Sequence, residues 1–135
     1  MPVSFYIDED RGIVVGRATG VVLAADIIEE LSRLMAESKG RAAALPHLFM
    51  PDERASHHAM DLEGLKSVKD QMQAWIASVG VTGLVKHVIV AADLVHDPVA
   101  PLWQAMAEAD PEMGFIVRVF PTEEAALAWL TQDTP

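Results

Sequence analysis

The residues most suited to chemistry lie in one short polar stretch and just after it. His57 and His58 are adjacent and Asp61 follows, so two imidazoles and a carboxylate could hold a divalent ion. Adjacent loop residues can point in different directions, and a structural metal takes about four ligands. Only His47 and His96, both remote in the sequence, could complete such a set. We therefore favour a solvated loop or a protein contact here, and we expect no resident metal or other cofactor.

Two further pairs have the residue types of acid–base or nucleophilic chemistry. Ser56 beside His57 could be a nucleophile with its base, but triads depend on three-dimensional geometry that sequence neighbours seldom reach. His96 beside Asp97 could be an oriented base. An Asp directly before Pro98 is more typical of a helix cap followed by a first-turn proline. Neither pair therefore predicts catalysis.

Trp103 is the one tryptophan with a site-like position. It follows segment 93–98, which comes directly after a predicted strand. Open α/β sheets bind ligands at the carboxyl ends of their strands. Aromatic rings with a polar group are also common in pockets and interfaces, although packing in the core is the simpler role. We keep Trp103 as a candidate for a pocket or interface.

The apolar pattern predicts the elements that must position these residues. Alternating apolar residues over 3–7 and a β-branched run over 13–16 favour two strands joined by a turn into an antiparallel hairpin. Further along the chain, apolar residues recur at intervals of three and four residues, which predicts helices. The expected later elements are a helix over 24–35, a strand over 46–50, a helix over 62–79 with Asp61 as its N-cap, a strand over 87–92, a helix over 99–106, a strand over 115–120 and a helix over 121–130.

This alternation predicts the fold class. Strands connected through helices usually become parallel neighbours with right-handed crossovers, whereas a tight hairpin makes the first strand antiparallel. The length of 135 residues is typical of one domain. We predict a single α/β domain over 1–135, with a mixed β-sheet, an N-terminal antiparallel hairpin and about four helices covering the sheet.

Composition excludes several classes of protein. The 0 Cys exclude disulfides, thiolate zinc sites and cysteine nucleophiles. The net charge of −10 argues against binding to nucleic acid or to anionic membranes. The longest uncharged stretch, 71–85, is too short for a membrane helix, so we expect no membrane insertion. Residues 1–12 lack the basic and apolar regions of a signal peptide, so we expect a cytoplasmic protein.

Three segments together carry a family resemblance. They are the end of the hairpin, RATG (17–20), then HVIVAADLVHDPVAPLWQAM (87–106) and the closing strand and helix, FIVRVFPTEEAALAWL (115–130). In this arrangement the chain resembles the SpoIIAA-like fold, and more narrowly the small bacterial STAS/SEC14-type proteins. The resemblance covers nearly the whole chain. It implies a mixed sheet, and its SEC14 side implies an apolar ligand pocket.

The best-known SpoIIAA-like proteins imply one further property. They are anti-sigma-factor antagonists, which bind partner proteins and are switched by phosphorylation of a Ser at the start of the helix after the third strand. The matching stretch here is SHHAMDL (56–62), which lacks the Asp-Ser pair of that switch. Ser56 lies several residues before the expected helix start, so we predict that Ser56 is not a phosphoswitch.

Our first prediction of function is a non-catalytic regulatory or protein-binding module. The alternative is a carrier or sensor of a small apolar, lipid-like ligand held between helix and sheet, and the least favoured reading is an enzyme using the His57/His58 loop. An internal apolar cavity would favour the carrier, and a closed core would favour the module. The candidate ligand or partner surface consists of Ser56, His57, His58, Asp61, His96 and Trp103.

Self-association is the last expectation. Val3, Phe5 and Ile7 form one face of the first strand, and a strand at a sheet edge has unpaired backbone groups that pair readily with another chain. We expect a symmetric homodimer. It should be weaker at low salt, where the net charge of −10 is less screened.

Overall fold

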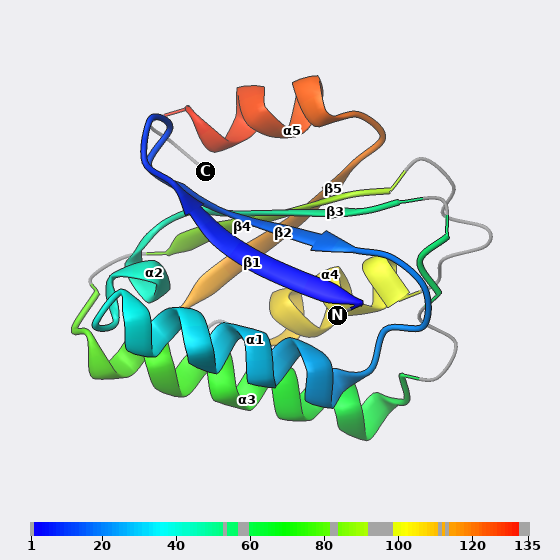
Figure 1. Cartoon of the computed structure of the whole chain (residues 1–135), viewed down its shortest axis with the longest axis horizontal. Coiled ribbons are helices and arrows are strands. Elements are labelled where there is room, and N and C mark those ends of the chain that lie inside the picture. The colour runs from blue at the N-terminus through cyan, green and yellow to red at the C-terminus, as the bar shows by residue number, and fades with distance from the viewer. Residues whose placement is uncertain are drawn as a thin grey trace.

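The computed structural model describes residues 2–52, 54–56, 60–81, 84–91, 99–110, 112 and 114–132. Within these ranges the chain forms one five-stranded sheet and five helices (Figure 1). The strands are β1 (Val3–Asp8), β2 (Ile13–Ala18), β3 (His47–Pro51), β4 (Val85–Val90) and β5 (Phe115–Phe120). The helices are α1 (Ala24–Glu37), α2 (Arg41–Ala44), α3 (Leu62–Ser78), α4 (Val99–Ala109) and α5 (Glu123–Leu130).

The strands lie in the sheet in the same order as in the sequence, β1-β2-β3-β4-β5. β1 pairs with β2 antiparallel, and the other three pairings are parallel. This confirms the predicted α/β class and its mixed sheet with an N-terminal hairpin. The described part of the chain has one more helix than expected, because α2 is a single turn of four residues, too short to show a helical period.

The sheet separates two layers of helices. Right-handed crossovers between neighbouring strands bring the connecting helices to one face, and Figure 1 shows α1, α3 and α4 together there, with α5 alone on the other face. Alternate residues of each strand therefore face different partners. Those facing α1, α3 and α4 build the larger core, and those facing α5 build a smaller one around Leu48, Val88 and Trp129.

Several strand boundaries differ from the prediction by one or two residues, and the start of β4 differs because of a buried lysine. β4 begins at Val85, two residues before the expected start at His87. Lys86 lies inside the strand, and its Nζ donates to the carbonyl oxygens of Trp129 (3.0 Å) and Gln132 (2.6 Å). A charged residue reads as a strand end in the sequence, but this one is buried beneath the end of α5.

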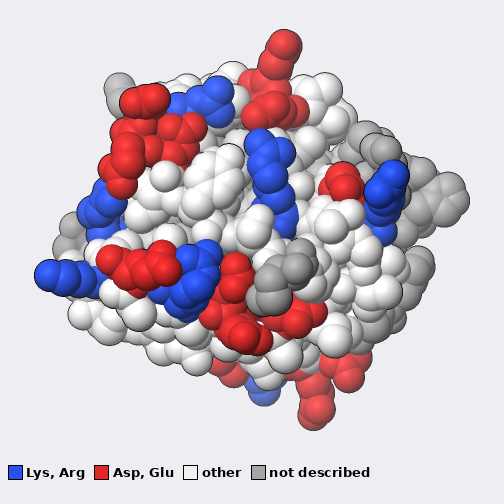
Figure 2. Space-filling model, in the orientation of Figure 1, with Lys and Arg blue, Asp and Glu red and all other residues white. Residues whose placement is uncertain are grey.

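Charged side chains of both signs are mixed on the surface. On the face in Figure 2, Lys and Arg lie among Asp and Glu. Along α1, Arg33 pairs with Glu37 at 2.8 Å and with Glu30 at 3.4 Å. The Arg33–Glu37 pair is exposed, whereas Glu30 is buried. An exposed pair contributes little stability, about 0.2–1 kcal/mol, so the cores carry most of it.

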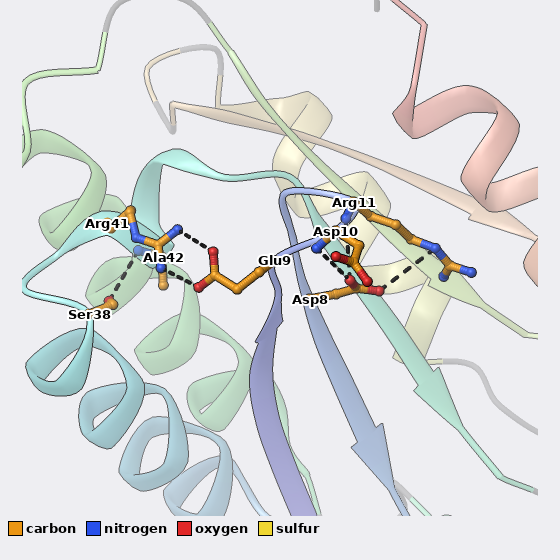
Figure 3. Close-up of polar contacts among 7 residues, drawn as sticks. All are labelled: Asp8, Glu9, Asp10, Arg11, Ser38, Arg41 and Ala42. Atoms are coloured by element: carbon orange, nitrogen blue, oxygen red, sulfur yellow. Dashed lines mark hydrogen bonds and ion pairs between the residues drawn. The ribbon is translucent and has the colours of Figure 1, made fainter.

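The hairpin turn is held by its own side chains and by α2 (Figure 3). Asp8 Oδ1 accepts hydrogen bonds from the backbone N–H groups of Asp10 (3.1 Å) and Arg11 (3.3 Å). Glu9 accepts from Arg41 at 2.6 Å and 3.3 Å. These contacts tie the hairpin to α2, next to the start of β3.

Candidate functional site

An apolar cavity, partly open to the outside among the described residues, lies between the sheet and the layer of α1, α3 and α4. Its volume is about 90 Å³. Both the sheet and all three helices contribute walls, which include Phe5, Ile27, Phe49, Met60, Leu65 and Trp103. The described lining contains no Asp, Glu, Lys or Arg. The cavity is therefore suited to apolar molecules rather than to ions.

Gly16 shapes one end of the cavity. It lies on β2 between Phe5 of β1 and Phe49 of β3, each its register partner. The two phenyl rings stack across it, with centroids 5.9 Å apart and planes 15° apart. A Cβ on Gly16 would lie 2.8 Å from Phe5 Cδ1 and 2.9 Å from Phe49 Cδ2. The glycine therefore leaves the space in which the two rings meet.

Two buried histidines also line the cavity. Parallel pairing of β3 with β4 places His47 opposite His87, and their rings stack with centroids 4.2 Å apart. Phe115 of β5 stacks on His87 at 4.5 Å, and Trp103 of α4 stacks on Phe115 at 5.8 Å. His47 is 6% exposed and His87 is 5% exposed. The sheet thus presents a row of aromatic rings to α4 and the cavity.

Burial keeps both imidazoles neutral at neutral pH. It lowers the pKa of His47 to about 4, and the hydrogen bond between Nε2 and the Ala42 carbonyl (2.9 Å) offsets this only in part. Because a carbonyl only accepts, Nε2 of His47 carries the proton. Burial, and secondarily the neighbouring His47, hold the pKa of His87 well below 6.5.

His87 has an unsatisfied polar atom. Among the described residues, its Nε2 is buried and has no hydrogen-bond partner. Buried polar groups in folded proteins almost always have one, and leaving one unpaired costs about 1–3 kcal/mol. His87 is therefore a position where a bound molecule could supply a missing interaction.

Three candidates from the sequence fall within the described residues. Asp61 is the N-cap of α3, as predicted, and its Oδ1 accepts from Gly64 N at 2.7 Å. Ser56 forms a parallel bridge with Val21, which fixes its backbone before α3 begins. Trp103 is 8% exposed and lines the cavity. These three side chains do not form one cluster: only Trp103 lines the cavity.

The remaining candidates, His57, His58 and His96, lie outside the described residues. In the part of the chain that is described, no three His, Cys, Asp or Glu side chains gather as a metal site would require. The expectation of no resident metal stays a prediction. The described helices include none long and apolar enough to cross a membrane.

The histidine pair was missed by the sequence analysis. His47 was weighed only as a remote ligand for the loop histidines, and His87 only as the start of a strand. The available signal was that two apolar strands each carry one histidine.

Comparison with protein-family models, curated proteins and solved structures found no match for this chain.

Proposed function

We propose that this protein binds a small apolar ligand in the cavity between the sheet and α1, α3 and α4. The observation that carries the proposal is the cavity itself, because well-packed cores leave few voids larger than a water molecule. The described part of its lining is apolar, so it offers a ligand no charged partner and gives a bound water few hydrogen bonds. This supports the carrier or sensor reading over a closed module.

The size of the cavity favours a compact ligand. An apolar cavity of about 150 Å³ holds benzene, whereas this one measures about 90 Å³. A long acyl chain would need a much larger space. Met60 and Met72 are flexible parts of the wall and allow modest expansion. We therefore propose a molecule no larger than about one small ring.

The test is to identify what the protein holds when it is purified from its own host. Mass spectrometry of the intact protein and of an organic extract should find a small apolar compound in near-stoichiometric amount. The matched control is Val68→Phe, which adds volume to a buried wall of the cavity and should exclude the compound. Identical extracts from both folded proteins, or no compound in either, would contradict the proposal.

We also propose the finer relationship, to the SpoIIAA-like fold and the STAS/SEC14-type proteins. The antiparallel hairpin followed by parallel strands supports it. The phosphoswitch of that group is not part of the proposal, because Ser56 precedes α3 by several residues. Incubation with host extract and ATP should leave Ser56 without stoichiometric phosphate by mass spectrometry. A non-enzymatic role and a cytoplasmic location likewise stay predictions.

A protein-binding module is the second candidate function. It is favoured by exposed apolar side chains at the start of α1 and α3, where Val21 is 59% and Leu62 is 62% exposed. A purified partner should bind at least tenfold more weakly to Leu62→Asp, a change that the start of a helix tolerates well. Ala128→Asp, at an exposed position of α5, is the control. Equal binding by both variants would exclude this surface.

A further inference from the structure

The volume of the cavity limits the size of the ligand, and the unsatisfied nitrogen of His87 indicates its chemical class. Both faces of the His87 ring are covered, by His47 on β3 and by Phe115 on β5. The ring can therefore meet a ligand only through its edge, where its nitrogen atoms lie. Nε2 is on that edge and lacks a partner among the described residues, and the ring lines the cavity. Nε2 itself is too enclosed for a water molecule to touch it, so a ligand hydroxyl meets it only when a neighbouring side chain of the cavity wall shifts.

The surroundings of this nitrogen limit the charge of its partner. The described cavity walls carry no ionised side chain, and both histidines are neutral at neutral pH. Moving an ion into such a place costs far more than one hydrogen bond returns. A neutral hydroxyl can donate to or accept from a neutral imidazole, whichever nitrogen carries the proton.

The positions of the walls give the ligand an orientation. The histidines stand at the amino-terminal part of β3 and β4, and Phe49 and Ile89 follow two residues later on the same strands. Two residues along a strand span about 6.6 Å. A ligand with its polar group at His87 would therefore lay an apolar body of that length against Phe49 and Ile89.

We propose that the ligand is a small uncharged molecule with an apolar body and one hydroxyl group, and that this hydroxyl hydrogen-bonds His87 Nε2. This inference rests on the proposed function, since it assigns the chemical class of the ligand in the same cavity. It also gives His87 a role beyond packing, as the residue that selects hydroxylated molecules over hydrocarbons of the same shape.

The test uses two probes that differ by one hydroxyl, cyclopentanol and cyclopentane. Titrations followed by amide NMR shifts in sealed samples give a dissociation constant for each. An alcohol without a partner in an apolar cavity loses its hydration and binds more weakly than the hydrocarbon. With His87 as partner, cyclopentanol should bind the wild-type chain at least as tightly as cyclopentane.

The variant His87→Leu should reverse this preference. It removes the nitrogen and keeps an apolar side chain, so cyclopentanol should lose about tenfold in affinity relative to cyclopentane. Leu34→Met is the matched control, because it alters a buried side chain of the same core that does not line the cavity and changes no strong hydrogen-bonding group. Its preference between the probes should equal that of the wild type.

A measurement on the wild type covers the case in which His87→Leu does not fold. The ¹⁵N shift of His87 Nε2 should change with cyclopentanol and stay nearly constant with cyclopentane. Binding of cyclopentane with no preference for the alcohol and no ¹⁵N shift would overturn this inference and leave the proposed function intact. Absence of binding by either probe would overturn the inference, and the host-purified protein would then decide the proposed function independently.

Discussion

Burial of His47 couples the stability of the protein to pH. In the unfolded chain its pKa is near 6.5, and in the fold it is about 4. The unfolded state therefore binds more protons between these values, so the free energy of unfolding falls as pH drops from 6.5 to 4. The loss at His47 amounts to about 3 kcal/mol. The lowered pKa of His87 adds to it in the same direction.

Urea unfolding at a series of pH values between 4 and 7.5 measures this dependence. His47→Phe keeps a stacked ring on His87 and removes the proton-binding group, so its stability should change less over the same range. The acidic side chains are common to both proteins, and the difference between the two curves therefore isolates His47. Parallel curves would show that His47 is not the source.

Gly16 should resist substitution because of the rings on either side of it. In Gly16→Ala the new methyl group would press on Phe5 and Phe49, and such overpacking typically costs about 1–3 kcal/mol. Urea unfolding should show this loss, and Arg17→Ala, at the exposed next position of the same strand, should change stability by less than about 0.5 kcal/mol. A Gly16→Ala protein as stable as wild type would mean that the two rings move apart freely.

The residues that were predictable from the sequence are those whose role is local. Asp61 caps α3 through a bond to Gly64, three residues away, and the sequence pattern contains both partners. His47 and His87 meet only because β3 and β4 pair in one particular register. A shift of one residue would turn either ring to the opposite face, and no local pattern sets that register. The cavity and its unsatisfied nitrogen were therefore not predictable.

At the scale of elements, Lys86 holds the end of α5. The last turn of a helix leaves carbonyl groups without partners inside the helix. Lys86 Nζ donates to the Trp129 and Gln132 carbonyls and lies 5.1 Å from the centre of the Trp129 ring. Thr122 caps the other end, accepting from Ala125 N at 3.2 Å. The helix that covers β4 is thus held at both ends.

Replacing Lys86 with Met should loosen α5. The variant keeps the length of the side chain but removes the charged donor, and it should lose about 2–3 kcal/mol of stability in urea unfolding. Amide hydrogen exchange should accelerate most in α5. Lys86→Arg retains donors and charge, so it should lose less than half as much. Equal losses in the two variants would point to packing rather than to hydrogen bonding.

The element order was predictable because each long element shows its own period, and β5 matches its predicted range, 115–120. The misplaced start of β4 has a different origin. The sequence places Lys86 at a boundary, and only its distant partners at the end of α5 allow it inside a strand. Local patterns therefore predict the presence and order of the elements well. They predict the boundary of an element badly where a long-range contact allows a charged residue inside it.

At the scale of the whole molecule, β1 forms one edge of the sheet. Thr19 N donates to Pro2 O, so the ladder alternation turns the backbone groups of Val3, Phe5 and Ile7 toward the free edge. Arg33 of α1 forms a hydrogen bond with one of these groups: its Nη2 donates to Phe5 O at 3.0 Å. Charged residues commonly protect sheet edges from pairing with another chain.

This contact gives the expected homodimer a direct test. If two copies pair through β1, each Arg33 must leave Phe5 O, so Arg33→Ala should strengthen self-association by about tenfold. Arg41→Ala removes the same charge from a pair with Glu9 in the hairpin turn, which binds no backbone group of the β1 edge, and should leave association unchanged. Sedimentation at low and high salt measures both effects. Association should rise with salt, because the net charge of −10 opposes it. Monomers in all variants at high micromolar concentration and both salts would exclude pairing through β1.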